Sequence, residues 1–331
     1  MQRRGLAICL VLGSLAGTDV SFARSPTADD VNAAEFGGKQ KSPQAVNLKA
    51  QVLLARAGFS PGAIDGRNGE NFQNALSAFQ KRNALNQSGK LDKETWAKLV
   101  QNSEPVLIEY TISAADLKGP FADEIPVKYA ERAKLKRLDY TSAPEMLAER
   151  FHMDQEFFEE LNRGKKLDQA GTALLVANVN VKPAAIGAKA GKLEKAAKIE
   201  ADKQNSIVRV LAKDGALLAT YPASIGSEAK PAPSGTLKVV RIARNPTYTY
   251  DPEFKFRGVK AEEKLHMAPG PNNPVGSVWI ALDQKSYGMH GAAEPSKVGK
   301  IGSHGCVRMT NWDALALAKM VRKGMPVQFI D

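Results

Sequence analysis

The sequence predicts a multidomain α+β protein with a small three-helix N-terminal domain, a small α/β middle module and a C-terminal mixed β-sandwich with an attached helix. Three observations predict this class. The chain has 331 residues, more than a typical single domain holds. Apolar residues recur at helical three- and four-residue steps before about residue 100 and follow strand patterns after residue 206. A charged stretch rich in small residues, 182–205, separates the two patterns and is predicted to be a linker.

The first 23 residues have the composition of a secretory signal peptide. Arg3 and Arg4 precede a thirteen-residue apolar run, Gly5 to Gly17, that is too short to span a bilayer alone. Ser21 and Ala23 place small residues at the two positions that a signal peptidase reads, which predicts cleavage after Ala23. The next segment, 24–42, is polar and is predicted to be a flexible lead.

Residues 43–101 are predicted to form three helices. The first ends at Gly58, the second carries Phe72, Leu76 and Phe79, and the third starts after Asp92 as its N-cap. Residues 105–181 are predicted to form a strand, two short helices and a closing strand, with a charge-rich helix or loop at 124–138.

Residues 206–331 are predicted to form the β-sandwich. Its strands are expected at 207–211, 217–221, 236–242, 275–282 and 327–330, with Asp214-Gly215 as a hairpin turn. The polar insert 245–271 is long enough to act as a lid or substrate wall. One helix is expected from Asn311 to Lys323, ended by Gly324 and Pro326.

The segment 289–311 carries the candidate chemistry. It contains Cys306, which becomes the sole cysteine once Cys9 leaves with the signal peptide, and an unpaired thiol in an oxidising compartment is a liability unless it is used. A thiol acts as a nucleophile in its thiolate form, so it needs a nearby base or positive charge to lower its pKa. The segment offers His290, His304 and Arg308. With no second cysteine to complete a zinc ligand set, we expect a cysteine nucleophile with no metal and no cofactor.

Met289-His290-Gly291 followed by Ser303-His304-Gly305-Cys306-Val307-Arg308 resembles the signature of the L,D-transpeptidase (YkuD-like) family, cysteine enzymes that cross-link bacterial peptidoglycan. The run 268–280 also resembles that family, and the resemblance covers about residues 206–331. Many members carry Asn where this chain has Arg308. The resemblance implies Cys306 as nucleophile, His290 as its base and the Gly291 carbonyl as the group that orients the imidazole. It further implies oxyanion or substrate-binding roles at Ser303, His304, Gly305 and Arg308.

Two further resemblances concern the N-terminal part of the chain. The segments 58–66, 75–80 and 89–99 are similar to the peptidoglycan-binding domain 1 family, and 105–181 is similar to a LysM domain. Both families imply peptidoglycan as the partner. We expect His152 to be a surface or packing residue and His266 to be a solvated loop residue. Tyr248, Tyr250 and Trp279 could line the cleft or simply pack.

The net charge of +11 would suit nucleic acid, anionic lipid or an acidic polymer. No nucleic-acid-binding motif accompanies the charge, and no other apolar run is long enough to span a membrane. We therefore expect a periplasmic L,D-transpeptidase that acts on peptidoglycan stem peptides. Two alternatives stay open: the same nucleophile attaches a wall-anchored protein to peptidoglycan or cleaves it off, or the chain is a non-catalytic peptidoglycan-binding scaffold.

Overall fold

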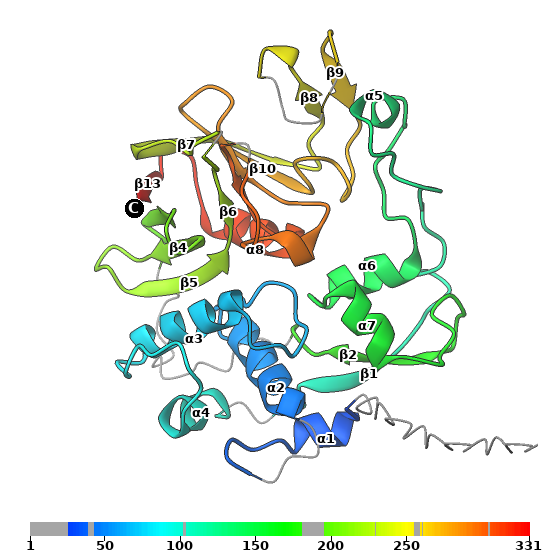
Figure 1. Cartoon of the computed structure of the whole chain (residues 1–331), viewed down its shortest axis with the longest axis vertical. Coiled ribbons are helices and arrows are strands. Elements are labelled where there is room, and N and C mark those ends of the chain that lie inside the picture. The colour runs from blue at the N-terminus through cyan, green and yellow to red at the C-terminus, as the bar shows by residue number, and fades with distance from the viewer. Residues whose placement is uncertain are drawn as a thin grey trace, which may run out of the picture.

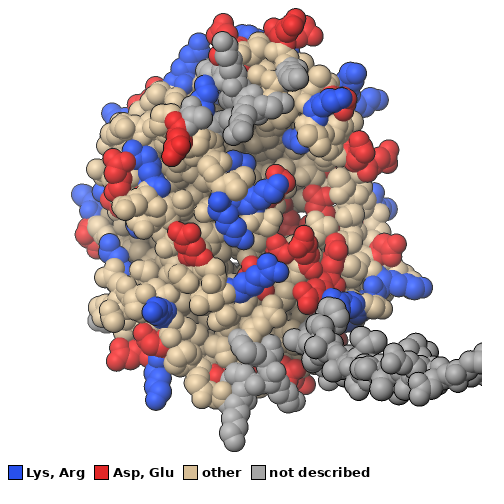
Figure 2. Space-filling view, in the orientation of Figure 1, with Lys and Arg blue, Asp and Glu red and all other residues tan. Residues whose placement is uncertain are grey.

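The computed structural model describes residues 26–38, 43–101, 104–180, 195–228, 230–254, 259, 261–303 and 305–331. The predicted signal peptide and His304 lie outside the described residues. Figure 1 shows a helical region (43–101), a middle region (104–180) and a C-terminal region (195–331) with the large sheet. Within the described ranges, the helices are all too short or too polar to cross a membrane. On the face in Figure 2, basic and acidic side chains are interspersed.

The helical region contains the three predicted helices, α2 (Pro43–Arg56), α3 (Glu70–Arg82) and α4 (Lys93–Leu99). The side chain of Asp92 accepts a hydrogen bond from the backbone N–H of Thr95, so the predicted N-cap is confirmed. The buried Gln80 amide bonds to the carbonyl of Lys90 and the hydroxyl of Thr95, which joins α3 to α4.

The predicted flexible lead is wrong between residues 28 and 32, which form helix α1 (Ala28–Asn32). Thr27 and Asp30 form a capping box at its start. Val31 is fully buried, and the Asn32 side chain bonds to both the N–H and the carbonyl of Leu107. The polar composition of this segment hid a helix that a cap and a single buried valine hold in place.

The middle region has the predicted order of strand, helices and strand. Strands β1 (Leu107–Thr111) and β2 (Ala173–Ala177) pair antiparallel, and α6 (Ala143–Arg150) and α7 (Gln155–Leu161) lie between them in the chain. A short helix, α5 (Tyr129–Arg132), precedes them. We call residues 112–142, between β1 and α6, the crossing segment.

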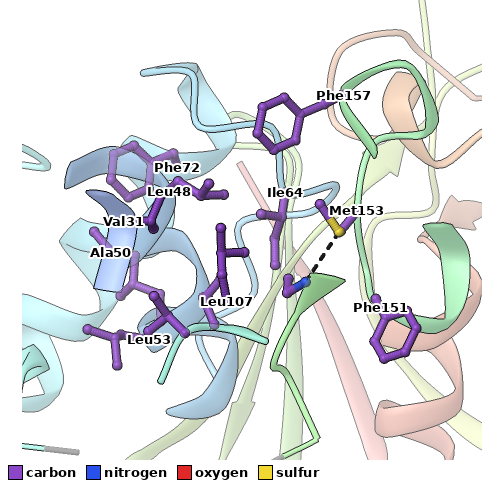
Figure 3. Packing of buried hydrophobic residues seen from close by; sticks show 14 of the residues in the cluster. Val31, Leu48, Ala50, Leu53, Ile64, Phe72, Leu107, Phe151, Met153 and Phe157 are labelled. Carbon is purple, nitrogen blue, oxygen red and sulfur yellow. Dashed lines mark hydrogen bonds between the residues drawn. The ribbon is translucent and has the colours of Figure 1, made fainter. Parts of the chain in front are cut away.

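The helical and middle regions share one hydrophobic core, although the sequence predicts two separate modules. Figure 3 shows Leu48 and Phe72 of the helical region in the same cluster as Leu107, Met153 and Phe157 of the middle region. The backbone N–H of Ala177 in β2 also contacts the Met153 sulfur at 3.3 Å. Each part is small, so sharing a core lets both bury more apolar surface.

The C-terminal region is built on a nine-stranded sheet of order β5-β4-β3-β13-β7-β10-β11-β12-β6. In chain order its strands are β3 (Lys198–Asp202), β4 (Ile207–Leu211), β5 (Leu217–Pro222), β6 (Ser224–Ile225), β7 (Gly235–Arg244), β10 (Val278–Leu282), β11 (Gly288–His290), β12 (Val307–Arg308) and β13 (Pro326–Ile330). Both halves of the sheet and α8 (Asn311–Met320) contribute to one core. The predicted α+β class is confirmed.

Strand β3 corrects the predicted linker, which was expected to reach residue 205. Its sequence alternates charged and apolar residues, and Ile199 and Ala201 are fully buried. β3 pairs antiparallel with β4 and parallel with β13, so this segment belongs to the centre of the sheet. The preceding stretch is rich in lysine, glutamate and alanine, so its linker-like composition led the prediction to include these residues as well.

The predicted insert after β7 contains a small hairpin of β8 (Tyr248–Tyr250) and β9 (Leu265–Met267). Single-turn 3₁₀ helices occur at Pro252–Phe254 and Pro295–Lys297. Figure 1 shows the hairpin at the edge of the molecule nearest α5.

Candidate active site

Strands β11 and β12 bring the His290 imidazole and the Cys306 thiol of the motif into one part of the fold. They pair in parallel, so Met289 lies opposite Val307 and His290 opposite Arg308. Met289 and Val307 are fully buried and fix both strands on the core. Cys306 directly precedes β12, and its thiol therefore comes from the strand next to the imidazole.

His290, Ser303, Cys306 and Arg308 line one cavity of about 560 Å³. Its walls also contain residues that the sequence did not single out. They include Tyr129, Arg132, Lys230, Arg241, Lys285, Ser286, Tyr287 and Glu294. Gly291 and Gly305 are the chain neighbours of the lining residues His290 and Cys306.

The His290 imidazole is held in one orientation. Its Nδ1 lies 2.7 Å from the Gly291 carbonyl oxygen, and because a carbonyl only accepts, Nδ1 carries the proton. Nε2 is then the basic nitrogen. The Trp279 ring stacks on the imidazole with centroids 5.6 Å apart. Burial is the main cause that lowers the pKa of His290 to about 4; the Gly291 bond opposes this shift and the Arg308 charge adds to it, so the imidazole is neutral at pH 7.

The Cys306 thiol is protonated at neutral pH. Burial raises its pKa to about 11, and the nearby Arg308 charge only partly opposes that effect. In the resting site burial therefore acts against the lowering of the thiol pKa that the motif predicts. The sulfur lies 3.6 Å from the carbonyl oxygen of Ser286, a residue in the left-handed region at φ 68°. Thiol and imidazole are both neutral before reaction.

The turn that carries Cys306 is fixed by Ser303. The Ser303 hydroxyl donates to the Cys306 carbonyl and accepts from the Gly226 N–H at 2.7 Å, and its own N–H donates to the Gly226 carbonyl. Gly305 adopts φ +101°, which a side chain would strain. The roles of the backbone N–H groups at Gly305 and Cys306 in binding an oxyanion stay predictions.

The packing around Gly291 leaves no room for a side chain. A Cβ atom there would lie 2.1 Å from the Asn311 side-chain oxygen. That oxygen accepts a hydrogen bond from the Ser277 N–H at 2.8 Å. The glycine therefore lets the first residue of α8 sit against the strand that carries His290. The motif contains both residues, but the contact between them was not predicted.

The cavity is cationic. Arg308 donates to the Gly302 carbonyl at 2.7 Å, which fixes one basic group at the wall. Four more basic side chains line the same space, namely Arg132, Lys230, Arg241 and Lys285. The one acidic side chain among the lining residues, Glu294, pairs with Lys297 at 2.5 Å. This charge balance suits an anionic ligand.

The residues left open by the sequence divide into two groups. Trp279 and Tyr248 line the cavity, whereas Tyr250 is buried. His266 is exposed on β9, where its Nδ1 lies 2.9 Å from the Thr249 hydroxyl. His152 stacks on Trp312 with centroids 5.0 Å apart, so it packs between the middle and C-terminal regions.

Wherever the chain is described, we find no cluster of three or more His, Cys, Asp or Glu side chains that could hold a metal ion.

Comparison with known families matches two segments of the chain. Residues 196–329 match the L,D-transpeptidase catalytic domain, and residues 48–99 match a provisionally described peptidoglycan binding domain. The matches identify an L,D-transpeptidase catalytic domain and a peptidoglycan binding domain within this chain. The resemblance of the middle region to LysM stays a prediction.

Particular relatives match over part of their length. A Bacillus licheniformis protein provisionally named L,D-transpeptidase YkuD is 37% identical over 91 residues, which cover 28% of this chain and 52% of that protein. The provisionally named L,D-transpeptidase YbiS of Escherichia coli K12 is 35% identical over 113 residues, covering 33% and 37%. The chain thus spans about half or less of the length of these two relatives.

Two solved structures are similar to the C-terminal region. The catalytic domain of the Enterococcus faecium L,D-transpeptidase is 23% identical, with a TM-score of 0.32, and the match covers 42% of this chain and all of that domain. L,D-transpeptidase 3 of Mycobacterium tuberculosis is 18% identical, with a TM-score of 0.34, and the match covers 41% and 61%.

Proposed function

We propose that the protein is a periplasmic L,D-transpeptidase that forms peptidoglycan cross-links through a thioester on Cys306. The observation that carries the proposal is the pairing in one cavity of a partly buried thiol with an imidazole whose Nδ1 is fixed on the Gly291 carbonyl. Both groups are neutral, so the imidazole is ready to take the thiol proton during attack. The catalytic-domain match at residues 196–329 supports the reaction class.

In the first half-reaction the Cys306 sulfur attacks the carbonyl carbon of an L-to-D peptide bond in a donor tetrapeptide stem. His290 Nε2 accepts the thiol proton as the carbon–sulfur bond forms. The carbon–nitrogen bond then breaks, and the leaving terminal D-amino acid takes that proton on its amine. Backbone N–H groups at Gly305 and Cys306 would stabilise the oxyanion, each contributing about 3–4 kcal/mol where such donors have been removed.

In the second half-reaction a side-chain amine of another stem peptide attacks the thioester. His290 accepts a proton from this amine and returns one to the sulfur as the carbon–sulfur bond breaks. The cationic wall around Arg308 would hold the substrate carboxylates. Residues 48–99 would keep the enzyme on the wall, and the signal sequence would direct it to the periplasm.

The test is mass spectrometry of the reduced, folded protein after incubation with a tetrapeptide-stem muropeptide and, separately, with a carbapenem. We expect an adduct on the peptide that contains Cys306, together with release of D-alanine from the muropeptide. Cys306→Ala should give neither product, and His290→Gln should slow acylation by about 10²–10⁴-fold. A wild-type protein that forms no adduct would support the non-catalytic scaffold instead.

The acceptor is identified from the product of the same incubation. A cross-linked dimer indicates transpeptidation between stems. Transfer of the acyl group to an added protein amine, or to water, would instead assign the attachment or cleavage reaction.

A further inference from the structure

The crossing segment is fastened to its own region at both ends. Near its start the Asp116 carboxylate accepts from the Tyr110 hydroxyl at 2.6 Å and pairs with Arg150 at 2.7 Å. Near the end of the segment the Tyr140 hydroxyl donates to the Glu149 carboxylate at 2.8 Å. The backbone carbonyl of Tyr140 accepts a hydrogen bond from the Ala122 N–H. The two ends of the segment are thus held together, which fixes where its outer part can reach.

The outer part of the segment lies against the C-terminal region. The Leu138 N–H donates to the Pro269 carbonyl, and the Leu138 carbonyl accepts from the Asn272 N–H, at 3.0 and 2.9 Å. Leu138 is fully buried, and a Cβ on Gly270 would lie 2.1 Å from its carbonyl oxygen. Figure 1 shows the result: α5 stands beside β9, away from α6 and α7 of its own region.

Helix α5 packs on the hairpin that borders the cavity. The Tyr129 ring meets the Tyr250 and Tyr248 rings edge-on, with centroids 5.6 and 6.4 Å apart. The Arg132 guanidinium lies over the Tyr129 ring at 5.6 Å, and its Nε donates to the Pro126 carbonyl. Tyr129 and Arg132 both line the cavity that contains Cys306.

We propose that Arg132 of α5 binds a carboxylate of the peptide substrate, so that the middle region forms part of the substrate-binding wall of the catalytic cleft. The identity of the peptide rests on the proposed function. An arginine held by a backbone carbonyl and an aromatic face presents a fixed guanidinium, which matches a carboxylate in two parallel hydrogen bonds. The remaining basic lining residues add to its attraction for anions.

The test measures binding in a protein that cannot react. In the Cys306→Ala background, a stem tetrapeptide with free carboxylates and the same peptide with its carboxylates amidated are titrated by calorimetry. We expect the free-acid peptide to bind more tightly. Adding Arg132→Gln should weaken its binding by about tenfold, as expected for the loss of a charge-assisted hydrogen bond, and should leave the amidated peptide unchanged.

Lys134→Gln is the matched control, because Lys134 is an exposed basic residue of the same segment that does not line the cavity. It should alter neither affinity. The proposal is overturned if Arg132→Gln weakens the binding of both peptides equally, if it changes the affinity for neither peptide, or if neither peptide binds. Thermal unfolding of each variant checks that the fold persists.

A second variant, Tyr129→Ala, removes the aromatic contacts of α5 with the hairpin. It should reproduce the selective loss for the free-acid peptide. These titrations use a protein without its nucleophile, so they assess Arg132 even if the wild-type protein forms no thioester and the proposed function fails.

Discussion

The carboxylate of Glu149 accepts hydrogen bonds from the side-chain amide of Asn311 at 3.0 and 3.2 Å, although the two residues are 162 positions apart. Glu149 lies in α6 of the middle region, and Asn311 is the first residue of α8. The same amide accepts from the Ser277 N–H through its oxygen. Burial raises the pKa of Glu149 to about 7. This buried polar link holds the middle region against the helix that follows the proposed nucleophile.

Replacing Asn311 by alanine should destabilise the protein by about 2–4 kcal/mol, because it removes a buried amide and leaves the partly buried Glu149 carboxyl and the Ser277 N–H with fewer partners. Urea unfolding followed by circular dichroism measures the change. Asn86→Ala is the control, since Asn86 is exposed, and it should stay within about 0.5 kcal/mol of the wild type. Equal effects of both substitutions would contradict the assigned role.

Asp313→Asn should remove a pH dependence of stability. The Asp313 carboxyl accepts a bond from the Ser60 hydroxyl of the helical region at 3.0 Å, and burial raises its pKa from 3.8 to about 7. A raised folded-state pKa means that the folded protein keeps a proton which the unfolded chain loses. Its contribution is therefore fully present below pH 4 and is lost as the pH rises to about 7.

The wild type should accordingly lose stability relative to Asp313→Asn by about 1.4 kcal/mol per pH unit between pH 4 and 7. Denaturant unfolding of both proteins at pH 5 and pH 8 measures the difference. Parallel pH profiles for the two proteins would show that Asp313 is ionised in the folded state.

Alkylation of Cys306 should be slow at pH 7 and should accelerate about tenfold per pH unit up to about pH 10, because burial raises the thiol pKa to about 11. Stopped-time alkylation with iodoacetamide, followed by mass spectrometry, gives the rates. A cysteine-containing peptide is the reference. A plateau already at pH 6–7 would indicate a preformed thiolate paired with a charged His290, against the neutral pair described here.

Trp279→Leu should raise the pKa of His290 from about 4 toward 6.5, because the stacked indole is part of what buries the imidazole. An NMR titration of the histidine ring protons measures the shift. Trp312→Leu is the reciprocal control. It should instead raise the pKa of His152, which burial lowers to about 3, and leave His290 unchanged. An unchanged His290 in Trp279→Leu would show that other groups bury it.

The sequence predicted what depends on neighbours in the chain. The Asp92 cap, the strand alternation and the contiguous motif at 303–308 are local patterns, and local sterics and hydrogen bonding decide them. The fold class followed from the local patterns, and the catalytic-domain family was indicated by the resemblance of the motif. Strand β3 was missed because its charged residues alternate with only two buried ones, and α1 because a single buried valine anchors it.

The remaining features of the site arise from contacts between distant segments. Arg132 reaches the cavity only because the crossing segment docks through Leu138, and no spacing in the sequence encodes that contact. The raised pKa of Cys306 depends on burial by several strands, whereas the motif alone suggested a lowered one. The sequence predicted Gly291 as a site residue, but it did not predict that Gly291 packs against Asn311.

Strand β5 forms one edge of the nine-stranded sheet, and the helical region covers part of it. The Thr220 N–H donates to the Gly58 carbonyl at 3.0 Å, and the Ser60 N–H donates to the Thr220 carbonyl at 2.9 Å. An open strand edge is a template for pairing with another chain. The turn at Gly58–Ser60 thus protects the sheet against self-association, and a fragment cut to residues 196–331 would expose this edge to aggregation.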